Sequence, residues 1–200
     1  MKPERWHHIA LSYSVTRPLL RLFVNGIKVL ERRQPLAMPD RMTPFVSLGA
    51  FADSLGAGRF LDCEIDNLRV WWDVLDETEI QRNMRRTLPG GAAARPGGPP
   101  ALRANFLMEA HSQETVFNNG GDSPDAELRG RPAFVRSAAP LSLGISLPAP
   151  DAGPLGKPAL SLPPGSYLRL ARQLLPRHGD ATFAFWWLSG TKRSTAMVVQ

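Results

Sequence analysis

Glu64 and Asp66 are the first residues whose types and spacing suggest chemistry, because one residue, Ile65, separates two carboxylates. Alternate residues of a β-strand project from the same face of a sheet. Two neighbouring carboxylates are what a retaining glycoside hydrolase uses as nucleophile and acid/base. This stretch therefore raises the question of an enzyme that cleaves glycosidic bonds.

Histidine and cysteine give weaker signals. His7 and His8 are neighbours, and neighbours on a strand point to opposite faces, so they do not easily share a metal ion. Neither stands at a recognisable spacing from a nucleophile. We expect His8 to pack and hydrogen-bond within the fold instead of acting as a general base. Cys63 is the only cysteine, so no disulfide forms within the chain, and we expect its thiol in the core.

Two adjacent tryptophan pairs are candidates for binding. In Trp71-Trp72 and in Trp186-Trp187, one ring should face inward and the other outward. The pattern favours Trp72 and Trp187 as the inward residues and Trp71 and Trp186 as the outward ones. An outward Trp can stack on a sugar ring or anchor a protein partner, or it can be covered by a loop.

The sequence predicts a hairpin over Leu20–Leu30. Asn25-Gly26 joins two apolar runs, and both residues tolerate the positive φ of a type I′ turn. The register should oppose Val24 to Ile27. Four apolar residues then share one face, which we expect to be buried: Leu22, Val24, Ile27 and Val29.

Alternating patterns predict further short strands and one helix. In Glu64–Trp72, the even-numbered residues from Asp66 onward should share one face. Asp76 followed by Glu79 predicts a capping box and a helix from Glu77 to about Arg86. The passage from Pro140 to Pro164 should hold little more than edge strands. The other expected strands are His7–Tyr13, Phe45–Gly49, Leu102–Met108, Ala133–Arg136, Tyr167–Leu170 and Thr182–Leu188. Many strands with one helix indicate an all-β sandwich or jelly roll.

Charge and composition exclude several classes of protein. The net charge is +6, but the basic residues are scattered among acids, so we expect a solvated surface and no nucleic-acid partner. No apolar run reaches the ~18 residues of a membrane span, so we expect no membrane insertion. The first residues do not resemble a signal peptide. Residues 89–101 consist mostly of Pro, Gly and Ala and form a linker between residues 1–88 and 102–200.

Two stretches resemble the laminin-G-like, concanavalin-A-like jelly-roll domains, a group that includes the pentraxins. They are WHHIALSYSVTRPLLRLFVNGIKV (residues 6–29) and FLDCEIDNLRVWWDVLDETEI (residues 60–80). The matching positions are Trp6, His8, Ile9, Ala10, Asn25, Gly26, Ile65, Asp66, Leu68, Arg69, Val70, Trp71 and Glu79. Cys63 departs from the family, which commonly has Gly there. The resemblance implies an antiparallel concanavalin-A-like β-sandwich.

The resemblance also decides between two roles for Asp66. Family members that hydrolyse glycosides place a further Glu where this chain has Leu68 or Arg69, so the carboxylate pair is broken and we expect no catalytic residue. The resemblance instead implies that Asp66 ties a loop or ligates calcium. Its candidate partners are Asn118, Asp122 and Asp125, although acids and amides in turns more often bond their own backbone.

The resemblance gives the chain an unusual organisation. Residues 1–88 are similar to the C-terminal half of one module, and residues 102–200 are similar to the N-terminal half of a second. Both ends fall in mid-strand, which suggests a piece of a tandem array. Alternatively, the two halves could close on each other as a circularly permuted sandwich.

These inferences predict a non-catalytic recognition module of a larger extracellular or cell-surface protein. We expect it to bind a glycan or an extracellular protein partner, beside neighbouring domains of the same protein. Two alternatives stay open. One is a structural spacer in a tandem array, and the other is an accessory β-sandwich of an enzyme whose catalytic domain lies outside this chain.

Overall fold

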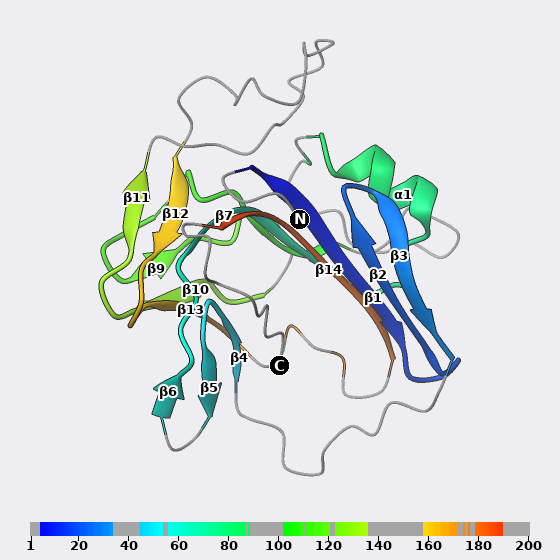
Figure 1. Cartoon of the computed structure of the whole chain (residues 1–200), viewed down its shortest axis with the longest axis horizontal. Coiled ribbons are helices and arrows are strands. Elements are labelled where there is room, and N and C mark those ends of the chain that lie inside the picture. The colour runs from blue at the N-terminus through cyan, green and yellow to red at the C-terminus, as the bar shows by residue number, and fades with distance from the viewer. Residues whose placement is uncertain are drawn as a thin grey trace.

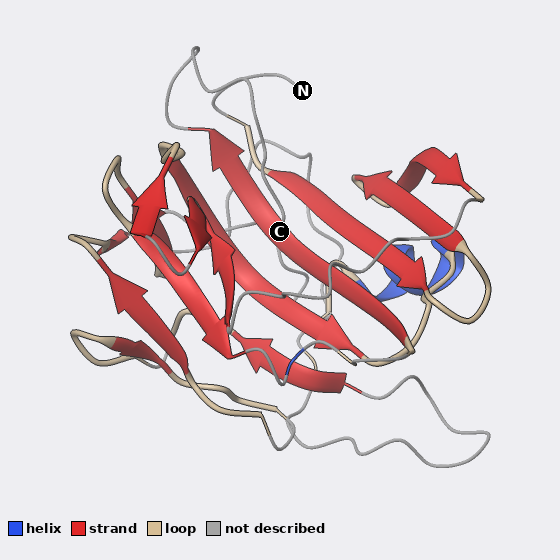
Figure 2. Cartoon of the chain, turned by 90° about the horizontal axis from the view of Figure 1, so that it is seen from below, coloured by secondary structure: helices blue, strands red, loops and turns tan. Residues whose placement is uncertain are grey.

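The computed structural model describes residues 5–33, 45–53, 56–86, 88, 102–109, 111–120, 123–135, 158–171, 174, 176 and 179–189. Within these residues the chain forms antiparallel strands and one short helix, α1 (Glu77–Asn83) (Figures 1 and 2). The strands are β1 (His7–Ser14), β2 (Leu19–Val24), β3 (Ile27–Arg32), β4 (Phe45–Leu48), β5 (Phe51–Asp53), β6 (Gly56–Gly58), β7 (Cys63–Trp71), β8 (Leu102–Phe106), β9 (Thr115–Val116), β10 (Ala126–Arg129), β11 (Ala133–Val135), β12 (Ala159–Leu162), β13 (Tyr167–Ala171) and β14 (Asp180–Ser189). The predicted all-β, antiparallel sandwich is confirmed.

Two sheets form the layers of the sandwich. The larger sheet has eight strands in the order β11-β12-β7-β14-β1-β2-β3, with β8 also beside β7. The smaller sheet has four strands in the order β4-β13-β10-β9, and β5 and β6 form a separate hairpin. One core cluster joins side chains of both sheets, for example Ile65 and Phe106 from the larger sheet and Leu168 from the smaller one. Burial of these apolar side chains stabilises the sandwich.

Strands from residues 1–88 and from residues 102–189 lie side by side in both sheets. In the larger sheet, β14 lies between β1 and β7, and β12 pairs with the opposite edge of β7 (Figure 1). In the smaller sheet, β13 pairs with β4. The two segments therefore form one sandwich in this structure. Their assignment to two successive modules stays a prediction.

The Asn25-Gly26 turn has the predicted conformation. Both residues have positive φ, 53° and 79°, and Val24 opposes Ile27 as expected. A bulge then shifts the register, so that Leu22 opposes Leu30. The prediction that Ile27 and Val29 are buried is wrong, because β3 is the edge strand of the larger sheet and both side chains are exposed.

A second bulge explains why the predicted faces of β7 are wrong. Asn67 has a φ of 52°, and the register against β14 shifts between Ala184 and Trp186. The extra residue reverses the alternation beyond Asn67. Ile65 and Leu68 consequently both enter the main core, whereas alternation would have placed them on opposite faces.

The helix packs on the outer face of the larger sheet. Its capping box is confirmed: Asp76 Oδ1 accepts from the Glu79 N–H at 2.8 Å, and Glu79 Oε2 accepts from the Asp76 N–H at 2.9 Å. A second core cluster lies beneath it and includes Phe23, Trp71, Leu75 and Ile80. The helix ends at Asn83, earlier than predicted.

The Pro-rich passage contributes more than the expected edge strands. β12 lies inside the larger sheet, between β11 and β7, with Leu160 opposite Ile65 and Leu162 opposite Cys63. Leu160 and Leu162 are fully buried. Pro163 and Pro164 follow the strand and do not interrupt its hydrogen bonds, which is why proline content alone misjudged this segment.

Candidate functional site

A hollow of about 540 Å³ opens at the β11 edge of the molecule. Two segments form its walls, one at residues 111–113 and one running from the end of β10 into β11. The lining residues are His111, Ser112, Gln113, Leu128, Gly130, Arg131, Pro132, Ala133 and Phe134. Its size is in the range of a small-molecule site, and most of its lining residues are exposed.

Two aromatic rings form one surface of this hollow. The imidazole of His111 and the ring of Phe134 are stacked, with centroids 3.4 Å apart and an interplanar angle of 6°. Phe134 is on β11, where it opposes Leu160, and it packs against the main core. His111 forms an isolated β-bridge with Val116. The sandwich therefore supports the aromatic pair from below, while His111 is exposed.

The turn at Gly130 shapes the other wall. Gly130 has a φ of +85°, and a Cβ there would lie 2.1 Å from the carbonyl oxygen of Gly165. Only glycine permits this close approach. The next residue, Arg131, donates its backbone N–H to Ser166 Oγ at 2.9 Å. These contacts fix the turn against the β12–β13 connection and leave the Arg131 side chain exposed.

The hollow combines an aromatic surface with polar groups. Ser112, Gln113 and Arg131 supply a hydroxyl, an amide and a guanidinium group. Among the described residues, those that line the hollow include neither Asp nor Glu, so they do not supply the two carboxylates of a retaining glycosidase. The arrangement suits binding of a polar ring compound.

No pattern in the sequence predicts this site. His111 and Phe134 are 23 positions apart in the sequence. The two rings meet because β11 pairs with β12 and His111 pairs with Val116. Both pairings are long-range or irregular, and no local pattern encodes them.

The expected outward tryptophans are both covered. Trp71 is 3% exposed and Trp186 is 4% exposed. Trp71 belongs to the cluster beneath α1, and Trp186 donates its indole Nε1–H to the carbonyl oxygen of Met84 at 3.0 Å. The helix and the residues after it therefore lie over both rings. Ligand binding by Trp71 and Trp186 stays a prediction, and it would require this cover to move.

The other member of each tryptophan pair gives a mixed result. Trp187 points into the main core, as predicted. Trp72 was expected inward but is 39% exposed, because β7 ends at Trp71 and the chain turns away. Its indole Nε1–H donates to the carbonyl oxygen of Leu174 at 2.9 Å, and the Arg103 guanidinium lies 4.1 Å from the ring centroid.

The residues expected to bind calcium are only partly brought together. Asn118 and Asp125 are neighbours, and Asp125 Oδ1 accepts from the Asn118 N–H at 2.7 Å. Asn118 Oδ1 accepts from the Asn105 N–H at 2.9 Å. Asp66 is buried on β7, and Asp122 lies outside the described residues. The described part of the chain holds no group of three or more His, Cys, Asp and Glu residues that could bind a metal.

These bonds favour the turn-forming role for the loop. The carboxylate of Asp125 and the amide of Asn118 satisfy nearby backbone N–H groups, and Asn118 Nδ2 donates to the carbonyl oxygen of Ser123 at 2.7 Å. A calcium ion would compete with backbone donors for the same oxygens. Calcium binding at this loop remains a prediction.

Comparison with known families places the first part of the chain. Residues 1–81 match a laminin G family model, described as the concanavalin A-like lectin/glucanases superfamily. This segment is therefore similar to that superfamily, and residues 82–200 lie outside the match. The match covers β1 to β7 and most of α1. No curated protein and no solved structure matches the chain.

Similarity to this laminin-G-like superfamily carries a coarse functional statement. The family suggests a carbohydrate- or protein-binding module, is generally non-catalytic, and is typically extracellular. No helix among the described residues is long and apolar enough to cross a membrane. The hollow lies outside the matched residues, since its lining begins at His111.

Within the laminin-G-like segment, Arg69 has a structural role that the motif alone did not reveal. It is buried, and its guanidinium donates to the carbonyl oxygens of Asn83 at 2.7 Å and Arg86 at 2.6 Å. These carbonyls belong to the C-terminal end of α1 and to the residues just beyond it, where a cation is favourable. Burial lowers the pKa of Arg69 to about 10, and the charge of Asp66 opposes this shift.

His8 is also structural, as its position on β1 suggested. Its backbone N–H donates to Asn25 Oδ1 at 2.9 Å, and its ring meets the ring of Trp186 edge-on at 5.3 Å. Burial lowers the pKa of His8 to about 3, and the nearby charge of Arg69 contributes to this shift. The imidazole is therefore neutral at physiological pH.

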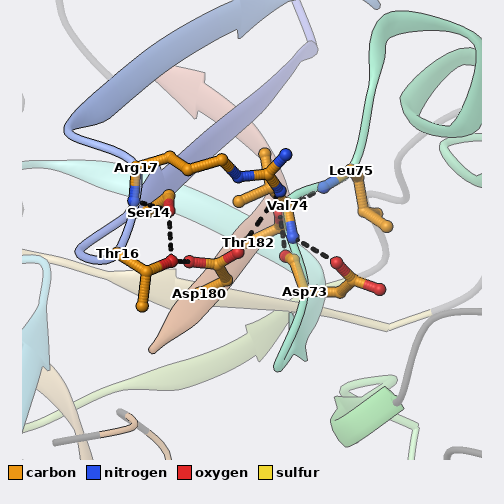
Figure 3. Close-up of polar contacts among 8 residues, drawn as sticks. All are labelled: Ser14, Thr16, Arg17, Asp73, Val74, Leu75, Asp180 and Thr182. Atoms are coloured by element: carbon orange, nitrogen blue, oxygen red, sulfur yellow. Dashed lines mark hydrogen bonds and ion pairs between the residues drawn. The ribbon is translucent and has the colours of Figure 1, made fainter. Parts of the chain in front are cut away.

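A hydroxyl network fastens the chain that leaves β7 (Figure 3). Thr182 on β14 donates its Oγ1–H to the carbonyl oxygen of Asp73 at 2.7 Å and accepts from the Leu75 N–H at 3.0 Å. Ser12 on β1 lies 2.9 Å from the same hydroxyl. Nearby, Asp180 accepts from Thr16 at 3.3 Å. These contacts position residues 73–75 and thereby the start of α1.

Proposed function

We propose that this chain is a non-catalytic recognition module of a larger extracellular or cell-surface protein, and that it binds a glycan in the hollow beside His111 and Phe134. The observation that carries the proposal is the stacked aromatic pair at a hollow with polar walls. The coarse expectation for the superfamily of residues 1–81 points the same way.

The chemistry of the hollow suits a sugar. A pyranose ring has an apolar face that packs on an aromatic surface, as other flat apolar groups do. Its hydroxyls need hydrogen-bond partners when they leave water. Ser112, Gln113 and Arg131 offer such partners around the hollow. A few convergent polar groups around an apolar surface are the usual composition of a small-ligand site.

The test is a glycan microarray with the purified chain, followed by calorimetry on any sugar that binds. We expect His111→Ala and Phe134→Ala each to weaken binding at least tenfold, because each removes part of the aromatic surface. Phe117→Ala is the matched control, since Phe117 is an exposed aromatic residue outside the lining of the hollow. His111 is exposed, so its variant keeps the fold intact even where Phe134→Ala costs stability.

Two results would overturn the proposal. One is a folded chain that binds no glycan in the panel, which would favour the structural spacer. The other is glycan binding that both variants leave unchanged. Repeating calorimetry with EDTA, and then with added Ca²⁺, tests the separate proposal that calcium takes part through Asp66, Asn118, Asp122 and Asp125. A neighbouring catalytic domain in the full protein would favour an enzyme's accessory sandwich.

A further inference from the structure

β3 forms one end of the larger sheet, and among the described residues no strand pairs with its outer edge. An edge strand presents a row of backbone N–H and C=O groups that can pair with another chain. This edge lies at the opposite end of the strand order from β11, which lines the hollow. The two regions are therefore separate surfaces.

The side chains of β3 are unusually apolar for an exposed edge. Ile27 is 60% exposed, Val29 is 55% exposed and Leu30 is 36% exposed. They are adjacent along one strand, whereas the other large exposed apolar residues of the described chain, Trp72 and Phe117, lie elsewhere. A contiguous exposed apolar group of this kind marks an interaction site more often than chance.

The charges around β3 are mainly positive. The hairpin of β2 and β3, together with the residue that follows it, carries one carboxylate, Glu31. It carries four cations, which leaves a surplus of three positive charges: Arg21, Lys28, Arg32 and Arg33.

Glu31 is already engaged by several of these cations. Its oxygens accept from Lys28 at 2.7 Å, from Arg33 at 3.0 Å and from Arg21 at 3.2 Å. These bonds lower the pKa of Glu31 to about 2, so its carboxylate stays ionised. The neighbouring cations balance its negative charge. A partner therefore meets a cationic edge.

These features select one kind of partner. A second copy of this hairpin would bring its own surplus of three positive charges against this one, which opposes pairing. A lipid surface cannot satisfy the backbone hydrogen-bonding groups of an open edge. An extended peptide that carries acidic residues satisfies the backbone groups and complements the charge.

We propose that the outer edge of β3 binds an extended acidic peptide segment, which joins the larger sheet as an additional strand. Backbone hydrogen bonds to β3 supply much of the affinity. Apolar side chains of the peptide cover Ile27 and Val29, and its carboxylates lie near Lys28 and Arg32. This interaction does not depend on the hollow.

The test uses the full chain and a fluorescein-labelled nine-residue peptide of alternating Val and Glu. We expect saturable binding by fluorescence anisotropy, weaker at high salt, and none for the matched peptide of alternating Val and Lys. Hydrogen exchange should show new protection at the backbone amides of residues 27–32. That protection distinguishes strand addition from non-specific ion pairing.

Variants locate the surface. The double variant Lys28→Glu/Arg32→Glu should weaken binding of the Val/Glu peptide at least tenfold, and Ile27→Thr should weaken it while keeping strand propensity. Arg129→Glu, on β10 of the smaller sheet, is the matched charge control and should bind as the unmodified chain does. His111→Ala should also leave peptide binding unchanged.

Five results would overturn the proposal. They are equal binding of the Val/Lys peptide, unaltered binding by the Lys28→Glu/Arg32→Glu variant, and peptide-induced protection confined to strands other than β3. The fourth is self-association in light scattering that the same double variant abolishes. Binding to phosphatidylserine vesicles in preference to the peptide would show a membrane-binding surface in place of a peptide site.

Discussion

The indole Nε1–H of Trp186 donates to the carbonyl oxygen of Met84 at 3.0 Å, although the two residues are 102 positions apart. Met84 is the C-cap of α1, three residues beyond the end of the laminin-G-like match at residue 81, and Trp186 is on β14 in the second segment. The helix of the first segment is therefore held partly by a side chain of the second. Asn105 adds a similar bond, from its Nδ2 to the carbonyl oxygen of Leu88 at 3.2 Å.

This contact predicts the effect of Trp186→Phe. The substitution keeps an aromatic ring but removes the donor, so the buried Met84 carbonyl loses its partner. We expect a loss of about 1–3 kcal/mol in the free energy of unfolding, measured by urea denaturation.

Trp72→Phe is the matched control for this measurement. Its indole also donates to a backbone carbonyl, that of Leu174, at 2.9 Å. However, Trp72 is partly exposed and water can replace the lost bond, so we expect about 0.5–1 kcal/mol. Equal losses in both variants would show that the Trp186 bond does not carry the attachment of the helix.

The fold class followed from local patterns that this chain carries clearly. The Asn25-Gly26 turn requires positive φ at both positions, and few residue pairs other than Asn-Gly provide it so readily. The capping box at Asp76 is similarly local. Such features depend on neighbours in sequence, so a single sequence predicts them well.

The faces of strands were harder to predict, because a bulge changes them without a distinct sequence signal. Asn67 adopts positive φ and shifts all later residues of β7 by one position, so alternation assigned Leu68 and Ile65 to different faces. The prediction that the apolar side chains of β3 are buried was wrong for a different reason. The position of β3 at the sheet edge depends on the strand order, which is set by contacts across the whole chain.

The candidate site lies at the limit of what sequence can predict. Trp71 and Trp186 were reasonable candidates because exposed aromatic residues bind ligands, but α1 covers the face on which they lie. His111 and Phe134 form the aromatic pair of the hollow through pairings that no periodicity encodes. Tertiary packing, and not local pattern, decides which aromatic rings are accessible.

The buried histidine predicts how stability depends on pH. The pKa of His8 is lowered from 6.5 to about 3 in the folded chain. Between these values the unfolded chain binds a proton at this residue and the folded chain does not, so stability falls as pH falls through this window. Urea denaturation at intervals from pH 7 to pH 4 should show this slope.

A variant separates His8 from the other titrating groups. His8→Leu removes the proton-binding group, and we expect the slope of stability against pH to decrease by up to one proton in the window. Trp72→Phe, which leaves His8 and the other titrating groups in place, is the control and should keep the slope. An unchanged slope in His8→Leu would contradict the prediction.

Alanine variants of two glycines with positive φ test how tightly the turn beside the hollow is constrained. Gly130 has a φ of +85°, and an added Cβ would lie 2.1 Å from the Gly165 carbonyl oxygen; Gly165 has a φ of +93° with no atom within 4 Å of such a Cβ. Both alanine variants bear a backbone cost of about 1–2 kcal/mol. We expect Gly130→Ala to lose about 1–3 kcal/mol more, because the turn must move.

Thermal or urea unfolding of both variants checks this difference. Gly130 also lines the hollow, so Gly130→Ala should alter ligand binding there, whereas Gly165→Ala should not. If the two variants are equally stable, the close approach of Gly130 to Gly165 is not a constraint on the turn.

The reactivity of the single cysteine reports whether the two segments stay associated when the covalent connection between them is cut. Cys63 on β7 opposes Leu162 of β12 and Ser189 of β14, both from the second segment. The thiol is buried, and burial raises its pKa to about 12. Reaction with a thiol reagent such as DTNB at pH 8 therefore requires these strands to separate.

A protease site placed within residues 89–101 of the full chain allows the connection to be cut after folding. We expect the cut protein to elute as one species and its Cys63 to react as slowly as in the uncut chain. Both rates should be on the order of 100-fold or more below the rate in urea, because the paired strands of β7, β12 and β14 must open first. Rapid reaction after cutting would show that the interface between the segments is too weak to persist alone, and the single sandwich would then depend on the linker.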